Sequence, residues 1–406
     1  MTVQNHELNS EINLPEDGEK TSRQFRSLKE LLDFASGKSV IKSLDQMEDS
    51  GIAELLPFPF LALVGQNEMK LALMLGLINP NIGGILLVGP RGTGKTTAVR
   101  SLLDLLPQIE RSACYYGCLP EDIETGGIDA VCPECAQKYG AGISLTVPDR
   151  VRLVELPLNS RLEDVVGGID ERAAVQDRMR IRRGILAQAD KNILYIDEIN
   201  LLSDEIIDAI LDAAAQGLYT VRRGAVVATY RSRFVLIGTM NPEEGKLRPQ
   251  ILDRFGLRII VRGLKITEER LEAYARVKAY LTNPRSLISA YADQSLFAKQ
   301  ELQEARMRLP HVLLPDELAN TAIQLIQKLK IDSLRAEITW FEAARAYAAA
   351  DGREVVTNVD LASVAPMSLR MRRSGFITEY FNIQNDEEKE LNQLLISLDD
   401  QIHENE

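Results

Sequence analysis

The stretch Gly89-Pro90-Arg91-Gly92-Thr93-Gly94-Lys95-Thr96 fits the phosphate-loop pattern G-x-x-x-x-G-K-[ST] at every fixed position. An apolar run over 85–88 precedes it and predicts a strand, and residues 97–106 predict the helix that follows. In this context the glycines let backbone N–H groups surround a phosphate, the lysine neutralises β and γ oxygens, and the last threonine supplies a ligand for Mg²⁺. The stretch therefore predicts a site for ATP and Mg²⁺, rather than only a glycine-rich turn.

A second apolar run, 193–196, ends in the acidic pair Asp197-Glu198. Asp197 is predicted to hold the Mg²⁺, directly or through water, and Glu198 to polarise the attacking water. The chain has three histidines, two of them in the polar end segments, so a carboxylate is the expected base. An apolar strand that ends in two acids is common by itself. Its pairing with the phosphate loop is what indicates ATP hydrolysis.

A third apolar run, 234–237, leads to Asn241 and Pro242. The Asn241 amide is predicted to orient the nucleophilic water or to contact the γ-phosphate. An Asn before Pro also starts ordinary turns, so this pattern is compatible with a structural role as well.

Three arginines farther along the chain are candidates for phosphate contacts. Arg248 and Arg254 lie just past the sheet region, where an arginine can reach the nucleotide of a neighbouring subunit as a finger in trans. The sequence does not decide between these two, and an ordinary surface arginine has the same appearance. Arg335 begins a predicted helix, from which its side chain is expected to fold back on the phosphates.

Five β-rich runs alternate with helical patterns, which is typical of an α/β fold with a parallel sheet covered by helices. The runs are 85–88, 152–156, 193–196, 234–237 and 258–261. Two further runs, 218–221 and 225–228, surround a glycine-containing turn and predict a β-hairpin. After about residue 264 the composition favours helices. One of them is predicted from near Arg335 to Ala350, and the next begins with a capping box of Thr357 and Asp360.

These patterns divide the chain into five segments. We expect a polar leader over 1–50 with one amphipathic helix between Phe25 and Ala35, an α/β nucleotide-binding core over 51–264 with a cysteine insert at 112–140, connecting helices over 265–310, a helical lid over 311–382, and an acidic tail over 383–406.

The charge of the chain is concentrated at its ends. Its 406 residues include 47 Lys and Arg against 59 Asp and Glu, which gives a formal charge of −12. Residues 1–20 and 386–406 carry −4 and −7 of this, leaving about −1 for the rest. The chain therefore offers no global basic field for nucleic acid. We also find no apolar run long enough to span a membrane and no targeting signal, and we expect a cytoplasmic protein.

The order of these motifs resembles that of the AAA+ ATPases, and several stretches resemble subunit I of the magnesium chelatases more closely. The resemblance runs from about residue 57 to 375. It rests on Val64-Gly65-Gln66-Asn67-Glu68, Ile82-Gly83-Gly84, the phosphate loop, Asp197-Glu198-Ile199-Asn200, Gly238-Thr239-Met240-Asn241-Pro242 and Leu252-Asp253-Arg254-Phe255-Gly256. It implies an AAA+ P-loop NTPase core with a parallel sheet, a β-hairpin insert and a C-terminal helical lid.

The resemblance also implies a function. Such a subunit forms a homo-oligomeric ring of six protomers with nucleotide sites between them, in which Lys95, Thr96, Asp197, Glu198 and Asn241 act in cis, Arg254 in trans, and Arg335 from the lid. ATP hydrolysis would drive a partner subunit with an integrin-like domain and a large porphyrin-binding subunit that inserts Mg²⁺ into protoporphyrin IX, for chlorophyll or bacteriochlorophyll synthesis. The alternatives are a cobaltochelatase-type ATPase and a MoxR-like remodelling chaperone that acts on a partner with a von Willebrand-type domain. A nucleic-acid translocase is disfavoured by the charge.

The four cysteines depart from this family pattern. They form two close pairs, Cys114 with Cys118 and Cys132 with Cys135, separated by thirteen residues rich in Gly and acids. Four thiolates in two pairs suit tetrahedral Zn²⁺, which would supply folding energy to a segment that cannot pack by itself. A redox dithiol pair is a second interpretation, and four cysteines without a special role are a third.

Overall fold

A five-stranded parallel sheet forms the centre of the part of the chain that the computed structural model describes, namely residues 56–106, 108–169, 181–224 and 226–372. The strand order is β4 (Leu153–Glu155), β5 (Ile193–Ile196), β8 (Val235–Met240), β1 (Ile85–Val88) and β9 (Leu257–Ile260). All four neighbouring pairs are parallel, with Ile85 opposite both Ile237 and Leu257. The prediction of a parallel sheet from these five runs is confirmed.

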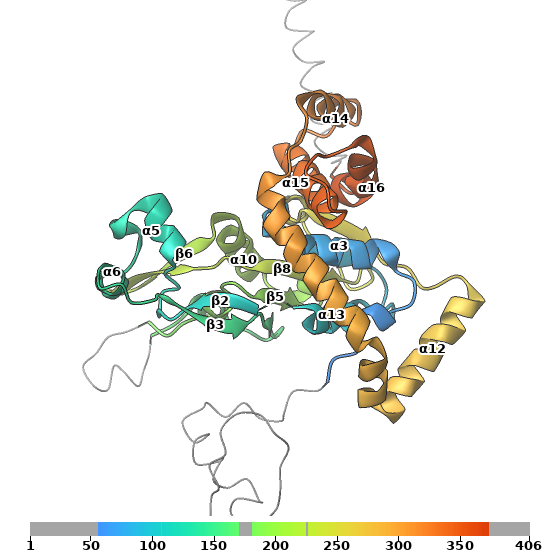
Figure 1. The fold of residues 1–406 in the computed structure, drawn as a ribbon, viewed down its shortest axis with the longest axis horizontal. Helices are drawn as coiled ribbons and strands as arrows, with labels where there is room; N and C mark the ends of the chain where they lie inside the picture. The colour runs from blue at the N-terminus through green and yellow to red at the C-terminus, as the bar shows by residue number, and fades with distance from the viewer. Residues whose placement is uncertain (1–55, 107, 170–180, 225, 373–406) are drawn as a thin grey trace, which may run out of the picture. The chain divides into compact units, whose positions relative to one another are not determined.

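Helices cover both faces of the sheet (Figure 1). Alternate residues of each strand point to opposite faces, so Ile85 and Leu87 belong to one core cluster and Leu86 and Val88 to the other. Every residue of β1, β5 and β8 is buried, which explains why their sequences are continuous apolar runs. The first face is covered by α3 (Asn67–Ile78), α4 (Lys95–Ser101), α13 (Pro284–Arg308) and α15 (Leu334–Ala350), and the second by α7 (Leu162–Val166), α9 (Ile185–Gln188), α10 (Asp204–Gln216) and α11 (Pro249–Arg254).

The helix after the phosphate loop differs from its prediction. It begins at Lys95, two residues earlier than expected, and it ends at Ser101, after which a 3₁₀ turn covers Leu102–Leu105. The early start follows from Gly94, which takes a left-handed conformation with φ of 84° and ends the loop there.

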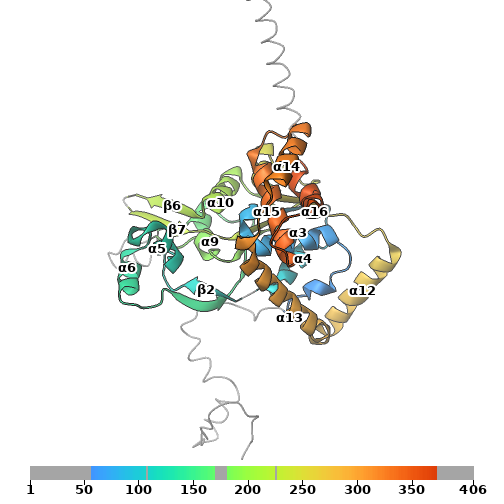
Figure 2. The ribbon, with the colours of Figure 1, turned by 45° about the horizontal axis from the view of Figure 1, so that its top comes forward.

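Two antiparallel pairs lie outside the central sheet. The predicted hairpin is present as β6 (Leu218–Arg223) and β7 (Val226–Arg231), both longer than expected. A second pair was not predicted. It joins β2 (Gln108–Ser112) to β3 (Thr146–Arg150) and brackets the cysteine insert, which contains α5 (Pro120–Gly126) and α6 (Pro133–Gly140). In both views the insert and the hairpin lie at the same end of the sheet (Figure 2).

The C-terminal part of the described chain is helical, as expected. After α12 (Thr267–Thr282) and α13 come α14 (Asp316–Lys328), α15 and α16 (Asn358–Leu369). The predicted capping box is confirmed, since Asp360 accepts hydrogen bonds from the Thr357 backbone N–H at 2.7 Å and from its hydroxyl at 2.9 Å. Trp340 of α15 donates to the Leu361 carbonyl of α16 at 2.8 Å and so ties these two helices together.

Every described residue belongs to one compact unit, which begins at Leu56. The predicted leader helix between Phe25 and Ala35 and the acidic tail over 383–406 lie outside the described residues. The five-segment division of the chain stays a prediction.

Candidate active site

The phosphate loop is shaped by the strands on both sides of β1. The Gly89 backbone N–H donates to the Met240 carbonyl at 3.0 Å, at the end of β8. A methyl group on Gly89 would lie only 2.1 Å from the carbonyl oxygen of Val261, so glycine is required there by close approach to the end of β9. The loop therefore takes its shape from the sheet.

Lys95 crosses the loop with its ammonium group. Nζ donates to the carbonyl oxygens of Gly89 at 2.7 Å and Pro90 at 2.8 Å, and the residue is 9% exposed. Burial lowers the pKa of Lys95 below its ordinary value, while the carboxylates of Asp197 and Glu198 oppose that shift. A buried cation beside backbone groups and carboxylates suits the binding of a polyanion such as a triphosphate.

Asp197 lies between two threonine hydroxyls at the carboxyl edge of the sheet. Thr96 Oγ1 is 3.4 and 3.3 Å from its two carboxylate oxygens, and Thr239 Oγ1 donates to Oδ1 at 2.5 Å. The Thr96 hydroxyl and the Asp197 carboxylate are the hard oxygen ligands that Mg²⁺ prefers. These two residues therefore fit the ion of MgATP.

Glu198 takes an unusual backbone conformation. Its φ of 51° lies in the left-handed region, which is uncommon for a residue with a side chain and frequent at functional sites. Its backbone N–H donates to Thr239 Oγ1 at 2.9 Å, which helps to hold this conformation. Its carboxylate pairs with Arg91 Nε at 3.6 Å, and Arg91 also pairs with Glu244.

Asn241 follows β8 and is 2% exposed. Its side-chain oxygen accepts from the Glu243 backbone N–H at 3.2 Å, and its carbonyl accepts from Asn200 Nδ2 at 3.4 Å. The bond from Glu243 forms the turn that an Asn before Pro predicts. Asn241 therefore has a structural role in this turn. The residue also lines the same cavity as the phosphate loop.

A cavity of about 200 Å³ brings the predicted groups together. It is lined by Arg91, Gly92, Thr93, Gly94, Lys95, Thr96, Thr97, Asp197, Glu198, Thr239 and Asn241. The five side chains predicted to act in cis are all among them. Thr239 was missed as a site residue because it lies inside an apolar strand. The signal was its place two residues before Asn241, since alternate strand residues share a face.

The three candidate arginines lie outside the lining of this cavity. Arg254 pairs with Asp212 at 2.8 Å and Asp208 at 3.6 Å, both on α10, and Arg248 pairs with Asp204 at 2.6 Å. Neither contact identifies the finger. The roles of Arg248 and Arg254 at a neighbour's nucleotide stay predictions.

Arg335 belongs to a network around Asp253, at the C-terminal end of α11. Asp253 accepts from Ser333 at 2.8 Å, from Arg335 at 3.2 Å and from Arg372 at 3.0 Å. Burial raises the pKa of Asp253, but the hydrogen bond from Ser333 and the charge of Arg372 outweigh it and leave the pKa below its ordinary value. Burial, together with the charge of Arg372, also lowers the pKa of the fully buried Arg258 to about 9. The network connects α11 to the C-terminal helices, and the predicted phosphate contact of Arg335 stays a prediction.

The four cysteines of the insert come together in space. The sulfur atoms of Cys114, Cys118, Cys132 and Cys135 all lie within 4.8 Å of one another, and all four are free thiols. The two pairs that the sequence separates by thirteen residues therefore form one cluster.

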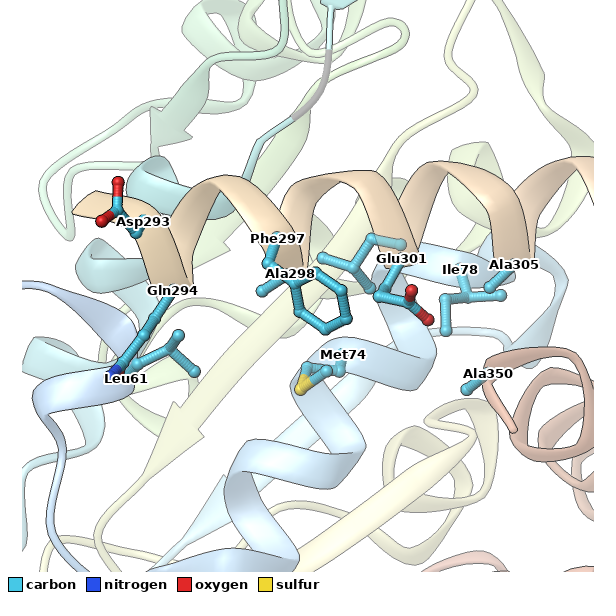
Figure 3. A pocket seen from close by; sticks show the side chains of 11 residues that line it. Leu61, Met74, Ile78, Asp293, Gln294, Phe297, Ala298, Glu301, Ala305 and Ala350 are labelled. Carbon is cyan, nitrogen blue, oxygen red and sulfur yellow. The ribbon is translucent and has the colours of Figure 1, made fainter. Parts of the chain in front are cut away.

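A second cavity lies away from the nucleotide site, between α3, α13 and the end of α15 (Figure 3). Its volume is about 660 Å³, and its lining is mainly apolar, with Met74, Ile78 and Phe297 among the larger side chains. It shares no lining residue with the nucleotide cavity, and we assign it no part in ATP hydrolysis.

Comparison with known proteins identifies the family. Residues 81–244 match the AAA domain family, and residues 319–394 match the AAA lid domain family. A relative named magnesium-chelatase subunit ChlI homolog, from Methanocaldococcus jannaschii, is 42% identical over 323 residues, which cover 79% of this chain and 87% of the relative. The chain belongs to the magnesium-chelatase subunit I family. The magnesium-chelatase 38 kDa subunit of Acidiphilium rubrum is 41% identical over 78% of this chain and 90% of its own length.

Among solved structures, a chain of the complex between subunits BchI and BchD of magnesium chelatase is 37% identical, with a TM-score of 0.44, and the match covers 80% of this chain and 99% of that chain. As a member of the subunit I family, the protein is an AAA+ ATPase with an α/β core and a helical lid. No helix of the described residues has both the length and the apolar composition needed to cross a bilayer.

Proposed function

We propose that this protein is the ATP-hydrolysing motor subunit of a magnesium chelatase and drives insertion of Mg²⁺ into protoporphyrin IX, for chlorophyll or bacteriochlorophyll synthesis. The observation that carries the proposal is identity of about 40% to magnesium-chelatase subunits over about four fifths of the chain, combined with a complete set of cis groups around one cavity. Mg²⁺ loses its water shell reluctantly, so coupling to ATP supplies work that a passive binding site lacks.

The proposed roles in the nucleotide site follow from the contacts of each side chain. Bound MgATP would supply the phosphoryl group and a metal that neutralises its charge. The backbone of residues 89–94 and the Lys95 ammonium would hold the phosphates, and Thr96 and Asp197 would hold the ion. Gly89 supports the role of the loop in phosphate binding, because the Val261 carbonyl leaves no room for a side chain at this position.

Glu198 is the proposed base that polarises the attacking water. Its left-handed backbone conformation and its place in the lining of the cavity support this role, and Asn241, which lines the same cavity, would orient the same water. Thr239 would position both acids, since its hydroxyl bonds to the Asp197 carboxylate and to the Glu198 backbone.

A neighbouring subunit is proposed to complete the site. The cations that line the cavity are Lys95 and Arg91, and Arg91 is engaged by Glu198 and Glu244. A further positive charge at the γ-phosphate would therefore come from elsewhere, which favours a finger in trans from Arg254 in a hexameric ring. Arg335 of the lid is a second proposed contact.

The proposed partners are the integrin-like-domain subunit of the chelatase and its large porphyrin-binding subunit. ATP and Mg²⁺ are the proposed cofactors of hydrolysis, and Zn²⁺ at the four cysteines is a third, structural cofactor. The cytoplasmic location expected from the sequence stays a prediction.

A chelation assay tests the function. The purified protein would be mixed with the two partner subunits, MgATP and protoporphyrin IX, and the metallated porphyrin followed by its fluorescence. We expect ATP-dependent insertion that is lost when the Glu198→Gln variant replaces the wild-type chain. Full ATPase activity without any Mg²⁺ insertion would overturn the chelatase proposal and favour a remodelling ATPase that acts on another partner.

A further inference from the structure

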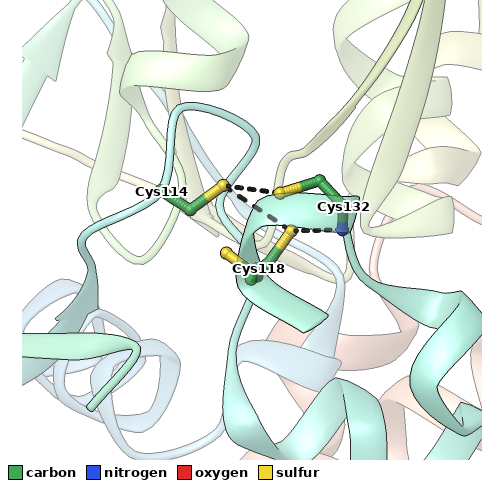
Figure 4. A group of neighbouring side chains, drawn as sticks. Cys114, Cys118 and Cys132 are labelled. Carbon is green, nitrogen blue, oxygen red and sulfur yellow. Dashed lines mark hydrogen bonds between the residues drawn. The ribbon is translucent and has the colours of Figure 1, made fainter. Parts of the chain in front are cut away.

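The sulfur atoms of the four cysteines form one compact cluster, of which Figure 4 labels Cys114, Cys118 and Cys132. Cys114 Sγ lies 3.7 Å from Cys118 Sγ and 3.5 Å from Cys132 Sγ, and all four sulfurs lie within 4.8 Å of one another. A zinc–sulfur distance of about 2.3 Å in a tetrahedron places the sulfurs about 3.8 Å apart. A disulfide requires about 2.0 Å. The two distances from Cys114 Sγ are therefore those of zinc-bound thiolates and not those of a disulfide, and the whole cluster is compact enough for four sulfurs to share one ion.

Backbone groups support the sulfur atoms. The N–H of Tyr116 donates to Cys114 Sγ at 3.2 Å, and the N–H of Cys132 donates to Cys118 Sγ at 3.3 Å. Such bonds stabilise thiolates and orient metal ligands. Four protein ligands leave no open position, which characterises structural rather than catalytic zinc.

The insert buries few apolar side chains of its own. All of residues 113–145 are described, and the only buried aliphatic side chains among them are Leu119 and Leu145. The small apolar cluster around the cysteines has three buried residues, namely Cys118, Cys135 and Leu145. The burial of two leucines does not by itself offset the ordering of about thirty residues, and a bound metal would supply further free energy of folding.

The residues between the first two cysteines contact the β6–β7 hairpin. Tyr116 stacks on Tyr230 of β7 with ring centroids 5.6 Å apart, and its carbonyl accepts from the Arg231 backbone N–H at 3.3 Å. Tyr115 also meets Tyr230, at 6.0 Å, and the Gly117 carbonyl accepts from Arg233 at 3.0 Å. The loop 114–118 thus carries two of the four clustered thiols and also contacts the hairpin.

A second link runs through Asp122 of α5. Its carboxylate is buried and pairs with Arg231 at 3.4 Å and Arg233 at 3.2 Å. Arg231 also donates to the Ala130 carbonyl at 3.1 Å, just before Cys132. Both halves of the cysteine cluster are therefore connected to the C-terminal end of β7.

We propose that Cys114, Cys118, Cys132 and Cys135 bind one structural Zn²⁺, and that this ion fixes the β6–β7 hairpin in position through the loop 114–118. The inference extends the zinc cofactor proposed above and is independent of porphyrin metallation, because ordering of the hairpin is measured without partner subunits. Without the ion the loop loses its shape, and the base of the hairpin loses Tyr116 and the Asp122 contacts.

The test combines metal analysis with amide hydrogen exchange on the full-length protein. We expect about one zinc per chain by elemental mass spectrometry, and thiols that react only after a mercurial reagent or a chelator displaces the ion. The Cys118→Ser variant is expected to lose the zinc and to show at least tenfold faster exchange in β6 and β7, with no change in peptides of β1 and the phosphate loop. If that variant does not fold, chelation and re-addition of Zn²⁺ to the wild-type chain give the same comparison.

Two further variants separate the ion from its effect on the hairpin. Tyr116→Ala is expected to keep the zinc and still speed exchange in β7, whereas Tyr139→Ala, at an exposed tyrosine of the same insert, should change neither. Four freely titrating thiols without zinc, disulfides in the isolated protein, or iron in place of zinc would overturn the metal assignment. Zinc-free protein with an unchanged hairpin would overturn the coupling.

Discussion

The loop between β1 and α4 and the insert between β2 and β3 are both polar segments, but different neighbours hold them in place. The loop follows a strand whose four residues are buried, and it is fixed by a hydrogen bond to the end of β8 and by contact with the end of β9. The insert has two buried leucines and four clustered thiols. The first segment takes its geometry from the hydrophobic core, and the second from local contacts around its cysteines.

Because of this difference, substitutions in the two regions should have different effects. The sheet holds the nucleotide groups at fixed positions, so a substitution among them should change the reaction and leave the fold intact. The insert depends on its proposed ion, so a substitution there should loosen the insert and the hairpin and leave the nucleotide site unchanged. A variant that affected both regions equally would contradict this difference.

The largest effects are expected at the nucleotide site, where Glu198→Gln is the first variant. Loss of the general base should reduce ATP hydrolysis by roughly 10²–10⁴-fold, while nucleotide affinity stays near that of the wild type. Steady-state phosphate release and binding of a fluorescent ATP analogue measure the two quantities. Normal turnover in this variant would refute the role of Glu198 as the base.

Lys95→Ala is the matched contrast at the same site. It removes the ammonium that bridges the loop, so nucleotide binding itself should be lost, and hydrolysis with it. Both variants should melt at the temperature of the wild-type protein in the absence of nucleotide. A large drop in melting temperature for either would show that the loop contributes to the fold as much as to binding.

The next largest effect is expected for Thr239→Val, which keeps the shape of the side chain and removes its hydroxyl. That hydroxyl bonds to the Asp197 carboxylate at 2.5 Å, and a hydrogen bond to a charged group contributes about 1.5–3 kcal/mol. We therefore expect hydrolysis to fall about 10-fold to 100-fold. Thr239→Ser, which keeps the hydroxyl, should retain most of the activity, and equal rates in the two variants would exclude this positioning role.

The same two regions show what could be predicted from sequence. The five strands were predictable because each is a continuous apolar run, and the cis side chains follow the ends of β1, β5 and β8, which meet at one edge of a parallel sheet. Thr239 was not predicted, because it lies within an apolar strand and its place two residues before Asn241 was not used as a signal. The pairing of the four cysteines in one cluster was proposed from spacing alone.

Long-range contacts account for most of what was missed. β2 and β3 are mostly polar and contain no buried residue, so they lack the pattern of a buried strand. Asp253 meets Arg372 across 119 positions in the sequence, and Tyr116 meets Tyr230 across more than a hundred. Tertiary packing sets these contacts, and no local periodicity reports them.

The smallest expected effect comes from Gly117→Ala, in the loop between the first two cysteines. Gly117 has φ of +80°, and an added methyl group would lie 3.1 Å from both Arg231 Cβ and Asp190 Oδ2. The left-handed conformation costs a residue with a side chain roughly 1–2 kcal/mol, so amide exchange in the insert should quicken about 5-fold to 30-fold.

Gly142→Ala is the matched control, because Gly142 has a similar φ of +71° in the same insert and nothing within 4 Å of the added group. Both substitutions should loosen the insert, but only Gly117→Ala, which crowds Arg231, should also speed exchange in β7. Neither should alter ATP hydrolysis. If both variants speed amide exchange in β7 by the same factor, strain anywhere in the insert reaches the hairpin. The loop 114–118 would then lose its assigned role as the point of contact.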